Sequence, residues 1–567
     1  MLAIIFLRLI LFFVTLVFLA ILLGEYMAKV FSGRKTFLSG FFQPLEKFLY
    51  KLFGINEKEE MNWKSYALNL LIFNLVGILL LYLIQTFQGF LPLNPQRMKA
   101  VRWDTAFNTA VSFVTNTNWQ AYSPEASLSY LTQMLCMTVQ NFLSAAVGIA
   151  AALALIRGFS RKETDGIGNF WQDLTRAILY ILLPLSILFA ILLASQGVIQ
   201  NFNPYVQAKT MEGAGQLIAQ GPAASQIAIK LLGTNGGGFF NANSAHPYEN
   251  PTPLSDFFQI ISFLLISAGL PLSFGILFKN RKRGLAIFSA MLIIFLLSVG
   301  VGVYSEFSPN PLLEKTGVLN GVNREGKDLR FGILSPIVFG VSTTSTSCGA
   351  VNSMHDSMMP LSGFVFLFNM MSGEVIFGGV GTGLISMFLF AMVSMFLVGL
   401  MIGRTPELYG KKLESFEIVM AVSAIIIPSI IQLSFGSLAV SVKAGISGLN
   451  NSGPHGLSEI LYAFASGAGN NGSAFAGLNA NTQFYNLLIA VAMFVGRFVV
   501  IIPALAIAGS LASKKTVPEA SRFPTETLLF VLLLVFVVII VGALTFFPVL
   551  ALGPFLEHLL LKSGRLF

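Results

Sequence analysis

The chain has 567 residues, 55% of them hydrophobic and 11% charged, with a mean hydropathy of +0.75. Many long apolar runs without a central charge are typical of membrane helices, which excludes an assembly of soluble domains. The formal charge of +9 does not indicate a nucleic-acid partner, because the 35 Lys and Arg residues cluster beside the apolar runs, where membrane topology explains them. Cys136 and Cys348 are too few and too far apart for a disulfide framework or a zinc site.

Ten apolar segments are predicted to span the membrane, since about 20 helical residues cross a core of about 30 Å. The first lacks the basic start and the short apolar stretch of a signal peptide, so we interpret it as a spanning helix. The seventh is too long for one straight helix and contains SGEVIFGGVGTG, which predicts a broken helix. The predicted spans are 2–23, 66–87, 129–156, 177–195, 257–278, 284–304, 361–402, 416–439, 484–511 and 526–550.

The distribution of Lys and Arg between the spans predicts their orientation. The connections after spans 1, 3, 5, 7 and 9 are basic, as in RGFSRK at 157–162 and KNRKR at 279–283. By the positive-inside rule these connections face the cytoplasm. Both termini and the longer connections after spans 2, 4, 6 and 8 are then extracytoplasmic.

The four outer connections share one pattern, in which a short helix-like segment leads into Ser, Thr, Asn and Gly. The matching stretches are AVSFVTNTNWQ (110–120), AIKLLGTNGGG (228–238), FGVSTTSTSCGA (339–350) and AFASGAGNNGSA (463–474). Aligned, they place Asn118, Gly236, Gly349 and Gly472 in one position. This internal repeat predicts an all-α polytopic membrane protein with four channel-like helix–re-entrant loop–helix repeats around a pseudo-fourfold axis.

The repeats divide the chain into six segments. Residues 1–64 are expected to form an N-terminal spanning helix and its cytoplasmic connection, and 516–567 a C-terminal spanning helix. The four repeats are expected at 65–157, 158–283, 284–412 and 413–515. Their loops are predicted near 115–120, 234–238, 346–350 and 470–473, with the helix break of the third repeat near 373–383.

Non-helical backbone at membrane depth persists only where protein buries it or where water and ions reach it. Carbonyl groups of four loops around one axis can replace the hydration shell of a cation. Glycine allows the backbone angles that aim successive carbonyls in one direction. Neutral Ser, Thr and Asn oxygens favour a monovalent cation over Ca²⁺ or Mg²⁺, which call for carboxylates. The alternative is that the Gly-rich loops only permit tight packing.

Two ionisable residues fall within predicted spans. Glu374 lies in the break of the seventh span and Arg497 in the otherwise uncharged AMFVGRFVVIIP. Ionisable groups at this depth indicate function, here at the exit of the ion from the loops. The alternative is a buried Glu–Arg pair that only fixes the broken helix.

Other patterns give no enzymatic function. EKTG at 314–317 lacks the aspartate of the P-type ATPase motif DKTGT, GGVGTG at 378–383 is no complete dinucleotide fingerprint, and no GxxxxGK[ST] occurs. The four histidines have no metal-ligand spacing, and His246 and His455 are interpreted as ordinary loop residues. The chain has no visible means of using ATP.

Five longer motifs identify a family. GTNGGGFFNANSAHPYENP, STSCGAVNSMHDS, GEVIFGGVGTG, LMIGRTPELYGKK and NNGSAFAGLNANT resemble the potassium-binding A subunits of bacterial Kdp-type potassium-transporting ATPases. The similarity runs along nearly the whole chain. It implies a non-catalytic, multi-pass subunit of the bacterial plasma (inner) membrane that captures K⁺ from outside and needs no organic cofactor.

The resemblance also implies a set of site residues and partners. K⁺ passes to a P-type ATPase, the catalytic B subunit, and a C subunit and a small single-span F subunit complete the complex. Glu374 and Arg497 match the family's positions near the inner exit of the filter, where a tunnel to the partner begins. The filter is expected to comprise Asn116, Thr117, Asn118, Thr234, Asn235, Gly236, Ser347, Cys348, Gly349, Asn470, Asn471 and Gly472, with Gln120 beside it.

Two alternative functions share parts of this pattern. A stand-alone transporter of the Trk or Ktr kind has the same four-loop logic but is driven by gradients. A membrane scaffold would use the loops only for packing. Stoichiometric K⁺ binding excludes the scaffold, and ATP-dependent uptake that needs a P-type partner excludes the stand-alone transporter.

Overall fold

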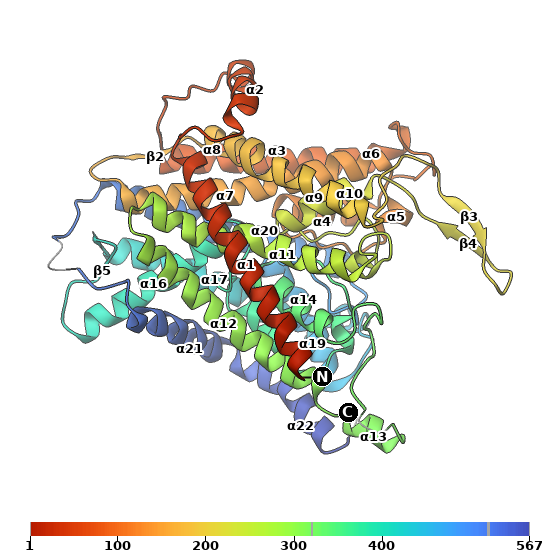
Figure 1. Ribbon diagram of the computed structural model, residues 1–567. Coiled ribbons are helices and arrows are strands. Elements are labelled where there is room, and N and C mark those ends of the chain that lie inside the picture. Colours follow the sequence, from red (N-terminus) through yellow and green to blue (C-terminus); the bar gives the residue numbers. More distant parts are fainter. Residues whose placement is uncertain (1, 319–320, 519–521, 566–567) are drawn as a thin grey trace.

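The computed structural model describes residues 2–318, 321–518 and 522–565, and within them the chain is mostly helical, with little strand. Ten described helical segments are long and apolar enough to cross a membrane, which confirms the predicted fold class. They lie alongside one another in one bundle (Figure 1). Their bounds are Ala3–Phe31, Trp63–Phe90, Tyr130–Ser160, Phe170–Ser195, Pro253–Leu277, Arg281–Lys315, Thr382–Met401, Ser415–Ser441, Gln483–Ser513 and Leu528–Lys562.

The regular helices within these spans carry the labels of Figure 1. They are α1 (Leu2–Phe31), α3 (Trp63–Phe87), α7 (Val139–Ser160), α8 (Phe170–Arg176), α9 (Leu183–Ser195), α11 (Pro253–Leu277), α12 (Arg281–Phe307), α16 (Thr382–Met401), α17 (Ser415–Ser441), α20 (Gln483–Ser513), α21 (Leu528–Leu550) and α22 (Leu556–Lys562). Turns of π-helix at Gln133–Thr138, Ala177–Leu182 and Ala551–Phe555 interrupt three of the spans.

Shorter elements connect the spans. Four of them, α4 (Trp103–Val114), α10 (Ala223–Leu232), α14 (Leu334–Ser345) and α19 (Gly453–Ala468), precede the four polar loops. The others are α2 (Ser39–Phe53), α5 (Pro124–Ser127), α15 (Pro360–Met371) and α18 (Lys443–Ile446), while α6 (Tyr130–Thr132) and α13 (Pro311–Lys315) form the start of the third span and the end of the sixth. Three antiparallel strand pairs join β1 (Met61–Asn62) to β2 (Gly166–Gly168), β3 (Val206–Lys209) to β4 (Gly215–Ile218), and β5 (Glu407–Leu408) to β6 (Lys411–Lys412).

The helix starts follow from local sequence. Thr252 caps α11 through a reciprocal pair of hydrogen bonds with Ser255, and Pro253 occupies the first helical position, where a missing N–H costs nothing. Asn280 and Thr482 cap α12 and α20 without a reciprocal bond, each accepting one hydrogen bond from a main-chain N–H of the first turn. The ends of several spans therefore coincide with a capping residue beside the apolar run.

The spans differ in how deeply they are buried by protein. The apolar part of Tyr130–Ser160 is 83% buried, whereas that of α1 is 17% buried, so α7 lies inside the bundle and α1 on its periphery. Small residues on α7 permit this close packing, since a Cβ at Gly158 would lie 2.6 Å from the Cα of Ala508 on α20. The protein core is therefore built around α7, next to the polar loops.

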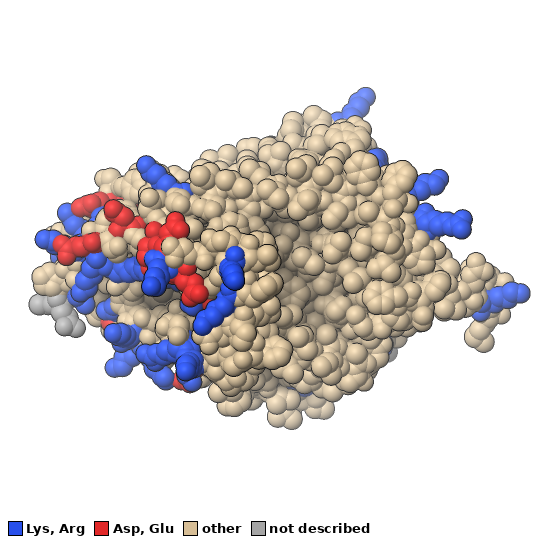
Figure 2. Space-filling model, turned by 90° about the horizontal axis from the view of Figure 1, so that it is seen from above, with Lys and Arg blue, Asp and Glu red and all other residues tan. Residues whose placement is uncertain are grey.

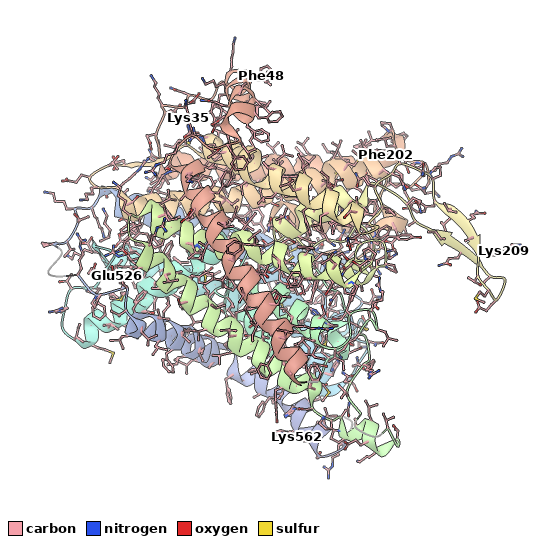
Figure 3. All side chains as sticks on the ribbon, viewed as in Figure 1. Lys35, Phe48, Phe202, Lys209, Glu526 and Lys562 are labelled. Atoms are coloured by element: carbon pink, nitrogen blue, oxygen red, sulfur yellow. The ribbon has the colours of Figure 1, made fainter. Side chains whose placement is uncertain are left out.

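The two ends of the bundle differ in composition. Both termini and the β3–β4 hairpin lie at one end, here called the terminal end, and β2 and β5 lie at the other (Figure 1). Charged side chains gather at the end with β2 and β5, here called the basic end, and a broad uncharged surface separates the two ends (Figure 2). Lys35 and Glu526 lie towards the basic end and Lys209 and Lys562 towards the terminal end (Figure 3).

Candidate functional site

Four short helices carry the polar loops into the centre of the protein. α4, α10, α14 and α19 each end directly before one of the repeated Ser, Thr, Asn and Gly segments. Eleven of the twelve residues at 116–118, 234–236, 347–349 and 470–472 are buried and Gly472 is partly exposed; we call the twelve the loop ring. All twelve belong to the site set expected from the sequence. Because each loop continues from a helix C-terminus, the partial negative charge of four helix ends favours a cation at this place.

The four loops make the same backbone hydrogen bond. In each, the N–H of the middle residue donates to the carbonyl of the residue five positions earlier, near the end of the preceding helix. The pairs are Thr117 to Ser112 (2.9 Å), Asn235 to Lys230 (2.8 Å), Cys348 to Thr343 (3.2 Å) and Asn471 to Ser466 (2.8 Å). The N–H groups of the four middle residues thus point back towards the preceding helices and not towards the centre of the ring.

The first and third residues of every loop have left-handed backbone angles. The φ values are 66° and 55° at Asn116 and Asn118, 49° and 82° at Thr234 and Gly236, 50° and 77° at Ser347 and Gly349, and 47° and 90° at Asn470 and Gly472. Asn118 replaces the glycine of the other loops, and asparagine is among the non-glycine residues that best tolerate this region. The first loop therefore keeps the same backbone shape as the other three although it has asparagine in place of glycine.

Three close approaches connect the third residue of one loop to the middle carbonyl of the next. A Cβ at Gly236 would lie 1.5 Å from the Cys348 oxygen, and one at Gly472 would lie 1.8 Å from the Thr117 oxygen. At Gly349 the corresponding distance to the Asn471 oxygen is 2.3 Å. No side chain fits at these three positions, so glycine is required by contact as well as by φ.

Side chains of the first loop residues complete the ring. Asn116 donates to the carbonyls of Gly233 and Thr234 (both 3.1 Å), which joins loop 1 to loop 2. Ser347 donates to the Gly469 carbonyl (3.1 Å), and Asn470 donates to the Thr117 hydroxyl (2.9 Å). Together with the glycine contacts, these bonds join each loop to the next along the chain and the fourth loop back to the first, which gives a closed ring.

The middle carbonyls of the ring are buried but lack internal partners. Within the described residues, no hydrogen bond is recorded to the carbonyl oxygens of Thr117, Asn235, Cys348 or Asn471. Buried carbonyls are nearly always paired, so such a group of free acceptors indicates a place for water or a cation. Neutral oxygens of this kind suit a monovalent cation.

A cavity of about 440 Å³, here called the vestibule, lies against the third residues of the four loops. Asn118, Gly236, Gly349 and Gly472 form its floor, one from each loop, and Gln120 lines its side. The side-chain amide of Gln120 lies 3.4 Å from the Tyr122 hydroxyl. The described lining residues are uncharged, so the vestibule offers dipoles and no fixed charge.

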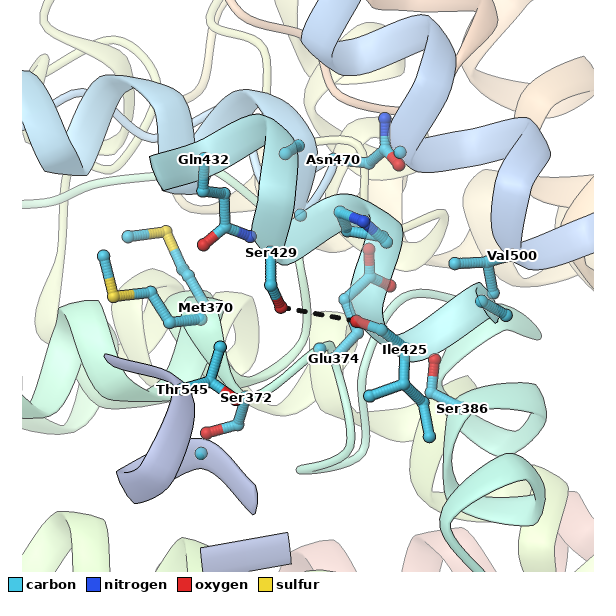
Figure 4. A pocket seen from close by; sticks show the side chains of 18 of the residues that line it. Met370, Ser372, Glu374, Ser386, Ile425, Ser429, Gln432, Asn470, Val500 and Thr545 are labelled. Carbon is cyan, nitrogen blue, oxygen red and sulfur yellow. Dashed lines mark hydrogen bonds between the residues drawn. The ribbon is translucent and has the colours of Figure 1, made fainter. Parts of the chain in front are cut away.

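A second, smaller cavity of about 40 Å³, enough for about three water molecules, adjoins the ring next to the break between α15 and α16. Glu374, Arg497 and Asn470 line it together with polar residues such as Ser386 and Gln432. Figure 4 shows Glu374 lying among these side chains, with Asn470 of the ring nearby. The structure therefore brings both predicted exit residues to one cavity beside the loops.

Glu374 and Arg497 have separate partners. The Glu374 carboxylate accepts from the Gly379 N–H (3.2 Å) and the Thr382 hydroxyl (2.9 Å), within the helix break. Arg497 donates to the Ser144 carbonyl on α7 (2.9 Å). The ion pairs recorded among the described residues do not include these two groups. No direct salt bridge joins them among the described residues, but both line one cavity, so the interpretation as a buried Glu–Arg pair that fixes the broken helix stays a prediction.

A buried ion pair behind the second loop was not expected from the sequence. Lys230 on α10 pairs with Glu249, and both side chains are fully buried. Lys230 also donates to the Asn243 side chain (2.7 Å), which in turn donates to the Gly236 carbonyl (2.7 Å). The isolated lysine in AIKLL was the available signal, but its acidic partner is found only through the fold.

His455 is not an ordinary loop residue, so that interpretation was wrong. It lies in the first turn of α19, with its two ring nitrogens 2.7 Å from Asp356 and 2.9 Å from Glu557. Burial alone lowers the pKa of His455, but these two carboxylates outweigh burial and raise the pKa to about 10. Asp356, His455 and Glu459 lie close enough to hold a metal ion, but both ring nitrogens of His455 already face carboxylates, those of Asp356 and Glu557.

Comparisons with known proteins agree with this architecture. The crystal structure of the potassium transporter TrkH from Vibrio parahaemolyticus matches 86% of this chain and 95% of that chain with a TM-score of 0.51, at 15% sequence identity, so the two share a fold. Proteins described as the potassium-transporting ATPase potassium-binding subunit match at 54% identity in Solibacter usitatus, covering 96% of each chain, and at 51% in Bradyrhizobium diazoefficiens, covering 99% of each. The model of the family described as KdpA, potassium-transporting ATPase A subunit, matches residues 10–559. The chain therefore belongs to the potassium-transporting ATPase A subunit family.

Proposed function

We propose that this chain binds K⁺ in the loop ring, as the potassium-binding, non-catalytic subunit of an ATP-driven potassium pump. The relatives' description as a potassium-binding subunit supports the choice of ion. The observation that carries the proposal is the closed circuit of four loops whose middle carbonyls are buried without internal partners. Carbonyl oxygens in such a ring replace the water shell of a dehydrated cation.

K⁺ enters through the vestibule of about 440 Å³, which faces the ring from the side of Gln120. The concentration of basic residues at the opposite end supports a cytoplasmic position for that end, with both termini extracytoplasmic in the bacterial plasma membrane. On this orientation the vestibule collects K⁺ from outside the cell.

The ion leaves the ring through the cavity that Glu374 and Arg497 line. Glu374 provides a carboxylate beside the ring, and Arg497 provides a fixed positive charge that directs the cation away from α7. From there K⁺ passes to the catalytic B subunit, a P-type ATPase that supplies the phosphorylation chemistry, in a complex with a C subunit and a small F subunit.

Glycine replacements test the ring directly. In Gly349→Ala, the added Cβ would lie 2.3 Å from the Asn471 carbonyl, so we expect weaker K⁺ binding and poorer discrimination against Na⁺ and Rb⁺. Gly300→Ala on α12 is the matched control, because the space around a Cβ there is open. Isothermal titration of each purified variant with KCl, and in separate runs with NaCl and RbCl, at constant ionic strength measures the affinity and the discrimination. Equal K⁺ titrations for Gly349→Ala and wild type would exclude the ring as the binding site.

The energy source is tested separately. We expect ATP-dependent K⁺ uptake in vesicles that contain the chain with a co-purifying P-type ATPase, and loss of uptake when that partner is removed. Gradient-driven uptake by this chain alone would favour the stand-alone Trk or Ktr type of transporter, whose fold it shares.

A further inference from the structure

The basic end of the bundle holds a polar pocket directly beside an apolar groove, and together they are complementary to the polar head and the acyl chain of a phospholipid. The polar pocket, of about 70 Å³, lies between the start of α2 and the end of α8. The groove, of about 590 Å³, lies between α1, α9 and the start of α2. Tyr180 lines both, so the two spaces are neighbours. We propose that this composite site binds one anionic phospholipid.

The polar pocket carries an excess of positive charge. Arg34, Lys35 and Arg176 line it against one carboxylate, that of Glu46. Glu46 is already occupied, because it accepts from the Arg176 Nε (2.8 Å) and from the hydroxyls of Tyr50 (2.8 Å) and Tyr180 (2.7 Å). The remaining guanidinium and ammonium donors match the geometry and charge of a phosphate group.

Neutral donors complete this pocket. The hydroxyls of Thr36 and Ser39 line it, 3.2 Å from each other. The first turn of the fifteen-residue helix α2 begins at Ser39, and its N-terminus adds the partial positive charge of the helix dipole. The pocket is therefore suited to a phosphodiester headgroup with its negative charge retained.

The groove next to it is lined almost entirely by apolar side chains, among them Leu23, Phe41, Leu185 and Leu188. Its volume falls in the range typical of small-molecule sites. An acyl chain placed there runs along α1 and α9, parallel to the spans, with its head at the charged end. This is the arrangement of a lipid in the adjacent leaflet of the bilayer.

The position of α2 supports a membrane ligand. In Figure 1, α2 stands at the edge of the bundle and is turned across the direction of the spans. Its outer surface exposes Phe48 (59%) and Phe53 (70%) together with Lys47 and Lys51. Aromatic and basic residues on one short helix are typical of helices that lie in the interface of an anionic leaflet.

The test uses the full-length chain purified in detergent with any subunits that remain bound. After delipidation, native mass spectrometry measures retention of phosphatidylglycerol and of phosphatidylcholine. We expect phosphatidylglycerol to be retained at least fivefold better, and this preference to be lost in Arg34→Gln/Lys35→Gln. Lys47→Gln/Lys51→Gln removes the same charge from α2 outside the pocket and is expected to keep the preference.

A second pair of variants tests the groove. Leu185→Trp fills part of the groove and is expected to lower the retention of phosphatidylglycerol at least fivefold. Leu75→Trp, on the exposed surface of α3, is expected to leave that retention unchanged. Equal retention of the two lipids by the wild type, or no loss in either pocket or groove variant, would overturn the proposal. It would also be overturned if inorganic phosphate alone gave the same thermal stabilisation as phosphatidylglycerol, since the pocket would then bind a free anion without the lipid.

Discussion

Replacing Lys230 by methionine is expected to change both stability and K⁺ affinity. The Lys230 and Glu249 side chains are fully buried, so Lys230→Met leaves an unpaired carboxylate in the protein interior. Loss of one partner from a buried ion pair typically costs about 3–5 kcal/mol of folding free energy. Lys230→Met/Glu249→Gln removes both charges and should recover most of that loss, because no charge is then left without a partner.

The effect on binding follows from Asn243. Lys230 fixes this side chain, which in turn holds the Gly236 carbonyl of the loop ring. If the loss of this restraint costs the bound state about 1.4 kcal/mol, a little more than one ordinary hydrogen bond, the Kd for K⁺ rises about tenfold. Isothermal titration with KCl gives the Kd, and the thermal midpoint without K⁺ gives the stability.

A second buried ion pair provides the control. Lys327 lies 3.0 Å from Glu306, and their side chains are 2% and 0% exposed, but Glu306 accepts from the N–H of Met359, which lies outside the loop ring. Lys327→Met should therefore lower the thermal midpoint without changing the Kd. The reasoning fails if Lys230→Met binds K⁺ as wild type does, or if Lys327→Met weakens binding equally.

Three further changes are expected to be measurable. Gly472→Ala places a Cβ 1.8 Å from the Thr117 oxygen, so the Kd for K⁺ should rise by at least tenfold in titration calorimetry, and an unchanged Kd would contradict the ring contact. Arg497→Gln, under the proposed exit role, should lower the rate of ATP-driven K⁺ uptake in vesicles, and an unchanged rate and affinity would exclude that role. Because the pKa of His455 is raised from about 6.5 to about 10, its stabilising contribution is complete below pH 6.5 and is lost as the pH rises through 10. The hydrogen-exchange protection factor of α22, which corrects for the faster intrinsic exchange at high pH, should therefore be lower at pH 10.5 than at pH 7, with a much smaller change in His455→Gln.

Much of the fold was predictable because membrane helices are encoded locally. A run of apolar residues has to form its own hydrogen bonds in lipid, so its length and composition indicate a span without knowledge of its neighbours. The fourfold pattern was also local, since each loop repeats the same short transition from helix to small polar residues. The exact ends were not predictable in this way. The apolar run ends near residue 23, but α1 continues through the more polar GEYMAKVF to Phe31.

The loop residues were predictable as a set, but their closure into a ring was not. Asn470 and Thr117 are hydrogen-bonded although 353 residues separate them, and nothing in either segment specifies the other. The same holds for Lys230 with Glu249 and for His455 with Glu557, where the sequence presents a polar residue and only the fold supplies its partner.

The sequence by itself therefore determined the ten spans, the four loops and the glycine positions, because these depend on hydrophobicity and backbone freedom within short segments. Only the tertiary structure decided which carbonyls are left without donors, which charges are paired, and where pockets lie beside the spans. Those features depend on packing between distant segments, where a shift of about one ångström separates a hydrogen bond from an unpaired buried group.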